Sequence, residues 1–127
     1  MSATTKLNPR VFKTTWFSKA AKKARIDDSA LCICMQQAVQ GQADDLGGGV
    51  FKKRINNNMH RAIILAKAGR FWIFEYLFAK NDRENIGADE LVQFRELAKA
   101  YTALSDKQIE QLIGNNHSVE ICDDNKD

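Results

Sequence analysis

The run "FWIFEYLF" at residues 71–78 constrains the fold more than any other part of the chain. Its aromatic and β-branched side chains are typical of a central β-strand. Successive side chains of a strand point to opposite faces, and both faces of this run are mostly apolar. Helices or loops are therefore expected to cover both faces of its sheet. The chain of 127 residues predicts a single domain, residues 1–127, with a substantial core.

A strand and two helices are expected before this run. "RVFKTT" (10–15) is typical of a short strand, and from Trp16 apolar residues recur at helical spacing among lysines, which predicts a basic amphipathic helix. Asp27 or Asp28 is suited to cap a second helix, and Gly41 to end it. A basic helix of this kind is usually a solvated face, but it can also bind phosphates or a membrane surface.

The segments around the run predict the rest of the sheet and its covering helices. Strands are expected at 50–55 and 59–67, on either side of three asparagines. A helical stripe of apolar residues runs through Tyr101, a capping box at 105–108 opens a last short helix, and residues 119–121 are expected to pair briefly. The order β-α-α-β-β-β-α-α predicts an α+β domain with a small antiparallel sheet built on a three-strand meander.

The three asparagines at 56–58 decide which cations share a face of the sheet. Asparagine tolerates the positive φ that tight hairpin turns need. A two-residue turn at the first two asparagines pairs position 52 with 61, and one at the last two pairs 54 with 61. Either turn puts Lys52, Arg54 and Arg61 on one face, whereas a three-residue loop pairs 53 with 61 and separates them. Like charges placed opposite each other destabilise a sheet, so a shared face favours a bound anion.

The second turn of the meander, expected at Ala68-Gly69, extends this face. In that register position 61 pairs with 76, and 63 with 74. Three residues then join the face of Arg61: Tyr76, Phe78 and Lys80. Cations beside aromatic rings suit a single-stranded nucleic acid, because phosphates bind Lys and Arg while bases stack on rings. Phe74 is expected to belong to the core.

The charge of the chain is unevenly distributed. Residues 1–70 carry 13 Lys and Arg against 4 Asp, a balance of +9, while residues 71–127 carry 6 against 12 Asp and Glu, a balance of −6. Such asymmetry is a hint of nucleic-acid binding through the basic half. The alternative is that the two halves interleave in space and their charges cancel.

The N-terminal segment "MSATTKLNPRVFKTT" has no apolar core typical of a signal peptide, which points to the cytoplasm. Cys32, Cys34 and Cys122 lack the spacing of a zinc site, and in a reducing compartment we expect them to stay reduced rather than form a disulfide. The most apolar stretch, at 71–79, is far shorter than the roughly 20 residues of a membrane helix. We therefore expect a cytoplasmic protein with no membrane partner, no metal and no cofactor.

The order of the predicted elements over residues 10–105 resembles the RelE/ParE superfamily of type II toxin–antitoxin toxins, most closely the HigB-like branch of RelE. Lys52-x-Arg54 followed by Arg61 resembles the basic pair and the arginine on successive strands of RelE-type enzymes, with Arg54 replacing a lysine. "GGGVFKKR" resembles the glycine-rich start of their second strand, and "FAKNDRENI" the segment after the last strand of HigB-like members. Residues 106–127 add a short helix and a tail.

The resemblance implies an endoribonuclease that cuts mRNA on the ribosome, inhibits translation and is neutralised by a helix-turn-helix antitoxin. One departure concerns the C-terminal region, where several relatives have a catalytic tyrosine or histidine. Here no tyrosine lies between Lys80 and Tyr101, and Tyr101 itself belongs to the apolar stripe. Two alternatives therefore stay open, a ParE-like gyrase inhibitor and a non-catalytic nucleic-acid-binding relative.

RNA cleavage through the ribose 2′-OH needs a base, an acid and cations that stabilise the extra charge on the phosphate. We expect Arg54 and Arg61 to bind the scissile phosphate, since guanidinium groups bind phosphate bidentately. Lys52 or Lys80 would handle a proton or stabilise charge. His60 is a weaker candidate for the base, because alternation sends it, like Lys53, to the opposite face, and His117 is expected at the surface. Further RNA contacts are expected from Lys53, Tyr76, Asn81, Arg83 and Asn85, with Asp82 helping to orient the substrate.

Overall fold

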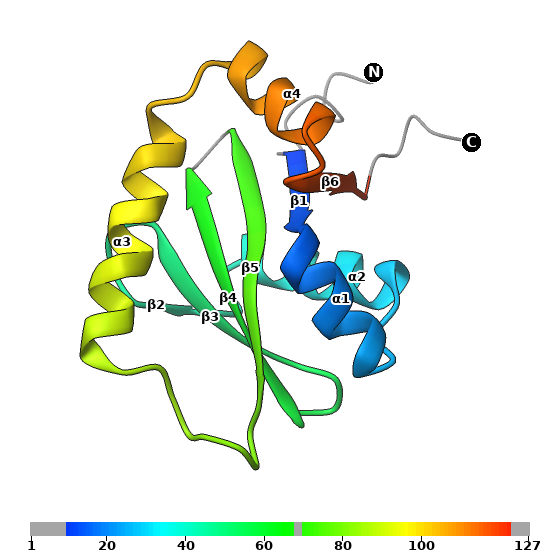
Figure 1. Cartoon of the computed structure of the whole chain (residues 1–127). Helices are drawn as coiled ribbons and strands as arrows, with labels where there is room; N and C mark the ends of the chain where they lie inside the picture. The colour runs from blue at the N-terminus through cyan, green and yellow to red at the C-terminus, as the bar shows by residue number, and fades with distance from the viewer. Residues whose placement is uncertain (1–9, 68–69, 123–127) are drawn as a thin grey trace.

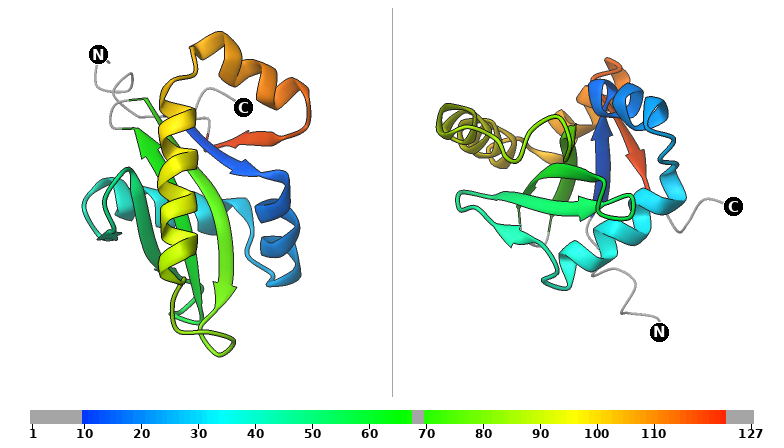
Figure 2. Two further views of the ribbon diagram at one scale, coloured as in Figure 1. Left: turned by 60° about the vertical axis from the view of Figure 1, so that its left-hand side comes forward. Right: turned by 90° about the horizontal axis from the view of Figure 1, so that it is seen from below.

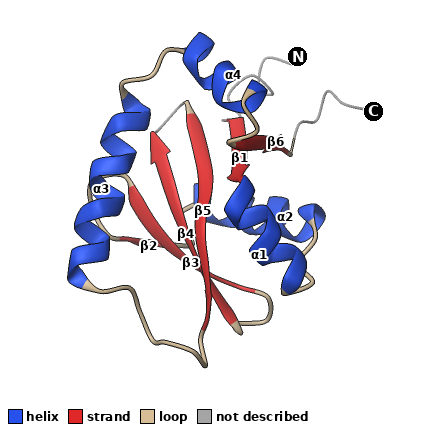
Figure 3. Cartoon of the chain, in the orientation of Figure 1, coloured by secondary structure: helices blue, strands red, loops and turns tan. Residues whose placement is uncertain are grey.

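The structure, a computed structural model, describes residues 10–67 and 70–122. Figures 1 and 3 show an α+β fold, as the sequence predicted, in which helices cover a central sheet. Its elements are β1 (Arg10–Thr14), α1 (Thr15–Lys23), α2 (Asp28–Val39), β2 (Asp44–Asp45), β3 (Val50–Ile55), β4 (His60–Lys67), β5 (Phe71–Ala79), α3 (Ala88–Thr102), α4 (Asp106–Gly114) and β6 (Ser118–Ile121). The turn predicted at Ala68-Gly69 lies outside the described residues.

The sheet has the strand order β2-β3-β4-β5-β1-β6. Neighbouring strands are antiparallel except β1 and β5, which run parallel. The expected meander is therefore the β3-β4-β5 part of a larger sheet. The N-terminal strand β1 pairs with β5, and β2 and β6 are the two edge strands of the sheet.

The central strand β5 is covered on both faces, as its sequence predicted. Trp72, Phe74 and Leu77 are buried in one core with side chains of α1 and α2, including Phe17 and Leu31. On the other face, Phe71, Ile73 and Phe78 are buried with side chains of α3 and α4. Figure 2 shows α3 and α2 on opposite sides of the curved sheet. Each fully buried aromatic side chain stabilises the fold by about 1.5–3 kcal/mol.

The hairpin between β3 and β4 has the second of the two-residue turns considered above. Arg54 pairs with Arg61, and Ile55 pairs with His60. The Met59 N–H donates to the Asn56 carbonyl at 3.0 Å, which closes a turn around Asn57 and Asn58. All three asparagines have φ between 54° and 69°, the left-handed conformation that asparagine tolerates better than most residues. The three asparagines therefore permit this tight turn, and the pairing of β3 with β4 sets its register.

The predicted pairing between β4 and β5 was wrong in register and right in face. Arg61 pairs with Phe78 rather than with Tyr76, and Ile63 pairs with Tyr76. Near the turn, Lys67 pairs with Phe71, one residue away from the predicted register. Glu75 has no partner on β4 and forms a bulge, which shifts the register by one further residue. Two shifts of one residue restore the original face, so Tyr76 and Phe78 still accompany Arg61. The bulge also sends Phe74 to the opposite face, where it is fully buried.

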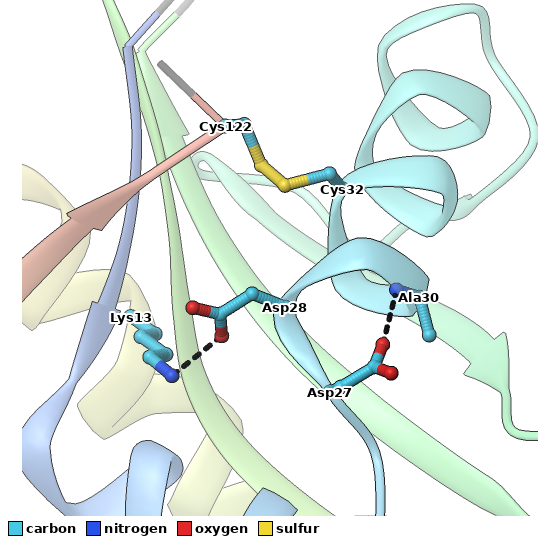
Figure 4. The surroundings of a disulfide bond; sticks show 6 residues. All are labelled: Lys13, Asp27, Asp28, Ala30, Cys32 and Cys122. Atoms are coloured by element: carbon cyan, nitrogen blue, oxygen red, sulfur yellow. Dashed lines mark hydrogen bonds and ion pairs between the residues drawn. A yellow bond between two sulfur atoms is a disulfide. The ribbon is translucent and has the colours of Figure 1, made fainter. Parts of the chain in front are cut away.

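Side-chain caps begin the two N-terminal helices. The Thr14 hydroxyl accepts from the Phe17 N–H at 3.0 Å and caps α1, which begins one residue earlier than predicted. Of the two aspartates considered for α2, Asp27 is the cap, accepting from the Ala30 N–H at 2.9 Å. Asp28 instead forms an ion pair with Lys13 at 2.6 Å (Figure 4).

The prediction that all cysteines are reduced was wrong. Cys32 of α2 and Cys122, directly after β6, form a disulfide with a Cα–Cα distance of 5.5 Å (Figure 4). Cys34 is free and half-buried. The two bonded residues are 90 positions apart, and they meet because β6 pairs with β1 at the edge of the sheet beside α2. The sequence prediction relied on the expected compartment, and no local pattern indicates this long-range pairing.

None of the helices in the described ranges has the length and apolar character needed to cross a membrane.

Candidate functional site

Three cations of the β3–β4 hairpin gather on one face of the sheet. Alternation along β3 puts Lys52 and Arg54 on the same face, and Arg61 lies directly opposite Arg54. We call Lys52, Arg54 and Arg61 the basic cluster. Arg54 is exposed, while the other two are half-buried. The Arg61 guanidinium donates from Nη1 to the Asn58 carbonyl at 3.1 Å and to the His60 carbonyl at 3.2 Å, so the hairpin turn positions it.

The basic cluster is poorly neutralised by the protein itself. Within residues 10–67 and 70–122, none of its three members forms an ion pair within 4.0 Å of a carboxylate. Asp44 of β2 pairs in register with Lys52, which places one carboxylate at the edge of the cluster. Asp44 was not predictable from the sequence, because a two-residue strand inside a glycine-rich loop leaves no periodic pattern. Two arginines in direct opposition are destabilising, so the arrangement favours a bound anion.

Lys80 extends the cluster at the end of β5. Its backbone N–H donates to the Met59 carbonyl at 2.9 Å, which holds the start of the following loop beside the hairpin turn. The side chain is exposed, and Lys80 is the first residue after β5, two positions beyond Phe78, the partner of Arg61. The structure therefore brings all four predicted catalytic cations to one region.

Arg83, a predicted RNA contact, is held by protein groups. It forms an ion pair with Glu90, its Nε donates to the Asn85 carbonyl at 2.9 Å, and its guanidinium lies 5.6 Å from the Phe78 ring centroid. The hydrogen bonds that Arg83 donates to the Glu90 carboxylate raise the pKa of Arg83. Its Nη1 also lies 3.5 Å from the hydroxyl of Tyr76, the limit of a hydrogen bond. Arg83 is therefore placed to hold the loop after β5 against α3.

The other loop candidates lie at the surface. Asn81, Asp82 and Asn85 are exposed, beside the cations at the end of β5. Asn85 is partly engaged, because its Oδ1 accepts from the Ile86 N–H at 2.9 Å. Asn81 and Asp82 are in the turn that reverses the chain, where the Asp82 N–H donates to the Ala79 carbonyl at 3.0 Å.

Lys53 and His60 do not join the basic cluster. Lys53, a predicted RNA contact, is 9% exposed and lies on the opposite face, near Cys34. His60 also lies on the opposite face, where its Nδ1 is 3.0 Å from the Asn56 amide nitrogen. Both positions follow from strand alternation, which separates each of them from its neighbours Arg54 and Arg61.

Aromatic rings border the cluster along β5. Phe78 is 6% exposed and belongs to the core, whereas Tyr76 is half-buried. Tyr76 stacks on Trp16 with ring centroids 5.1 Å apart. The sequence pattern indicated Trp16 only as the start of a helix. Trp16 lies beside Tyr76 because β1 pairs in parallel with β5.

Comparison with known families decides how this arrangement is classified. The family model described as the RelE toxin of the RelE/RelB toxin–antitoxin system matches residues 9–121. The chain belongs to the RelE toxin family. No curated protein matches the chain. As a RelE-family toxin it has an antitoxin as its partner.

The C-terminal region of this RelE-family toxin contains a tyrosine with a different environment from the basic cluster. Tyr101 is 5% exposed, and its hydroxyl donates to Glu75 Oε1 at 3.3 Å. Burial raises the pKa of Tyr101 and raises that of Glu75 to about 7. His117 is exposed and contacts the edge of the Tyr101 ring with centroids 6.3 Å apart. These groups lie beside the α3–α4 core.

In the part of the chain that the structure describes, no group of three His, Cys, Asp or Glu side chains is placed to hold a metal ion.

Proposed function

We propose that this toxin is an endoribonuclease that cuts mRNA and inhibits translation. The observation that carries the proposal is the opposition of Arg54 and Arg61 beside Lys52 on one sheet face. Such opposition costs stability, and a phosphate between the two guanidinium groups offsets that cost. Fold membership alone does not specify the reaction, so the proposal rests on these residues.

The proposed reaction is attack of a ribose 2′-oxygen on the adjacent phosphorus, with departure of the 5′-oxygen. Arg54 and Arg61 bind the non-bridging oxygens through charge-assisted hydrogen bonds. Lys52 and Lys80 stabilise the additional negative charge that develops during attack, or one of them transfers a proton. Preorganised charge of this kind is often the largest single contribution to catalysis, and general acid–base help adds roughly 10²–10⁴ in rate.

Residues of the loop after β5 have supporting roles in this proposal. Asn81, Asp82 and Asn85 orient the RNA from the loop after β5, and Arg83 positions that loop through its ion pair with Glu90. The HigB-like branch, a helix-turn-helix antitoxin, action on the translating ribosome and a cytoplasmic location belong to the same proposal. They rest on the resemblance of the "GGGVFKKR" and "FAKNDRENI" segments.

A second candidate is a relative that binds RNA without cutting it. The observation that favours it is the environment of Tyr101, whose hydroxyl is engaged with Glu75. A protein that keeps the phosphate-binding arginines but lacks an available C-terminal acid or base would bind RNA and cleave it slowly or not at all.

The test compares wild type with Arg61→Ala and Lys52→Ala, using Lys99→Ala as a control for the loss of one exposed cation on α3. We expect wild type and K99A to arrest growth and to cut mRNA in a translating extract. Loss of a phosphate-binding charge should reduce cleavage by R61A and K52A at least tenfold. Unchanged toxicity in both variants contradicts the assignment. RNA binding without cleavage supports the second candidate, and inhibition of gyrase supercoiling without RNA cleavage supports a ParE-like activity.

A further inference from the structure

Trp16 is a large exposed side chain that packs against Tyr76 of β5. It is 52% exposed although it lies at the junction of β1 and α1, while the adjacent Phe17 is fully buried. One face of the indole stacks on Tyr76 at 5.1 Å between centroids and 24° between planes. The ring is thus fixed in orientation while half of its surface contacts solvent.

Tyr76 connects this indole to the basic cluster. Phe78 lies directly opposite Arg61, so Tyr76, two residues earlier on the same face, is a diagonal neighbour of Arg61. Diagonal neighbours in a sheet are about 7–8 Å apart, within reach of aromatic and long side chains. Tyr76 also contacts Phe78 and Phe94, each at 5.9 Å between centroids, which keeps its own ring from turning away.

We propose that Trp16, supported by Tyr76, stacks on a nucleobase of the RNA whose phosphate the basic cluster binds. The inference rests on the proposed function and specifies a base-binding subsite for it. A single strand binds best where cations meet its phosphates and aromatic rings meet its bases, and stacking tolerates any base because each has a π-face. Phe78 cannot serve in this way because its ring is buried, whereas Trp16 is 52% exposed and Tyr76 is half-buried.

The first measurement is binding of a short single-stranded 2′-O-methyl oligonucleotide, which lacks the nucleophile and cannot be cut. Trp16→Ala should weaken this binding roughly tenfold, whereas Trp16→Phe should keep most of the affinity. Inorganic polyphosphate, which has charges and no bases, should bind wild type and W16A equally. Thermal unfolding of each variant verifies that W16A is folded.

The second measurement does not depend on removing Trp16. The chain has two tryptophans, and Trp72 is 8% exposed in the core. In a Trp72→Phe variant the fluorescence comes from Trp16 alone, and the oligonucleotide should quench it while polyphosphate should not. An unquenched signal, or equal oligonucleotide affinity of W16A and wild type, overturns the inference. A parallel loss of polyphosphate affinity in W16A also overturns it, because the effect is then not due to stacking.

Failure of the base subsite and failure of the proposed function give different results. If the protein binds the oligonucleotide through Trp16 but never cuts mRNA, the subsite is supported and the endoribonuclease proposal is contradicted. If mRNA cleavage depends on Arg61 but W16A binds the oligonucleotide normally, the endoribonuclease proposal is supported and the subsite is contradicted.

Discussion

Arg54 and Arg61 face each other across β3 and β4, so each guanidinium raises the electrostatic free energy of the other. Replacing Arg54 with Thr, a good strand residue, should raise the free energy of unfolding by about 0.2–1 kcal/mol while reducing cleavage of RNA. Urea unfolding at low salt measures the first effect, and an mRNA cleavage assay measures the second. The stability gain should shrink in high salt, because screening weakens the repulsion in wild type.

Lys99→Ala is the matched control for this gain, since it also removes one exposed cation but from the last turn of α3. Lys99 interacts favourably with the helix dipole there, so its removal should not stabilise the protein. An R54T variant that is less stable than wild type at low salt would contradict the idea that the opposed arginines are under repulsion.

Glu75 should make stability depend on pH. Burial raises the pKa of this carboxyl from 4.5 to about 7 in the folded state. The folded protein therefore binds more protons than the unfolded chain between pH 4.5 and 7, and the free energy of unfolding falls as the pH rises through this window. The shift corresponds to a loss of up to about 3 kcal/mol. Urea unfolding at several pH values measures it.

The variant Glu75→Gln should remove this dependence, because the amide does not titrate and its oxygen still accepts from the Tyr101 hydroxyl. We expect E75Q to be more stable than wild type at pH 8 and to have a flatter profile between pH 4.5 and 7. Glu84→Gln replaces an exposed glutamate of the loop after β5 and should keep the wild-type profile. A decline of equal size in E75Q would assign the pH dependence to other groups.

The β3–β4 hairpin shows how far the sequence alone could specify an element. Three asparagines restrict the turn to the left-handed conformation, and strand alternation then fixes which side chains share a face. For this reason the basic cluster and the exclusion of His60 from it were predictable. Which two asparagines form the turn was not, because the choice depends on pairing over the whole length of β3 and β4.

The features that escaped prediction depend on contacts between distant segments. The bulge at Glu75 places its carboxylate beside Tyr101 of α3, and the sequence around Glu75 has no feature that predicts a bulge. The strand β2 has two residues and pairs only because β3 is already in place. Trp16 meets Tyr76 through the parallel pairing of β1 and β5, which the sequence order did not reveal.

The disulfide joins two elements that hydrogen bonds hold only indirectly, α2 and the edge strand β6. Closing a loop of this length should stabilise the protein by about 2–4 kcal/mol, mainly by restricting the unfolded chain. Cys122→Ser and reduction by dithiothreitol should lower the free energy of unfolding by similar amounts. Denaturing alkylation followed by mass measurement should find one reactive thiol in the oxidised protein and three in the reduced one.

Cys34→Ser is the matched control, because it removes the neighbouring thiol of α2 that is not bonded. It should change stability much less than Cys122→Ser. If the protein purified without reductant already shows three reactive thiols, the predicted contribution of the bond is contradicted. The pairing of β6 with β1, the buried contacts of Ile121 and the ion pair of Arg10 with Glu120 would then hold β6 without the bond.

Across the described residues, the two halves of the chain interleave in the sheet, because β1 of the first half lies between β5 and β6 of the second. Arg10 of the basic half binds Glu110 and Glu120 of the acidic half, and Arg70 binds Asp106. The excess of +9 in residues 1–70 is thus partly neutralised at the end of the sheet covered by α4. The basic cluster at the hairpin end has no such neutralisation within the described residues, so the net charge of +3 understates the field at the site.

This charge distribution predicts how RNA binding responds to salt. Each neutralised phosphate of a single strand contributes about −0.7 to the slope of log affinity against log salt concentration. Four cations, those of the basic cluster together with Lys80, should therefore give a slope of roughly −2 to −3 for the 2′-O-methyl oligonucleotide. Arg61→Ala should reduce the magnitude of the slope by about 0.7, whereas Lys99→Ala should leave it unchanged. Fluorescence titrations across a range of salt concentrations measure these slopes. If Arg61 neutralises a phosphate, its removal leaves that phosphate with its counterions and makes the slope smaller. Equal slopes for R61A and wild type would therefore place the RNA on another surface.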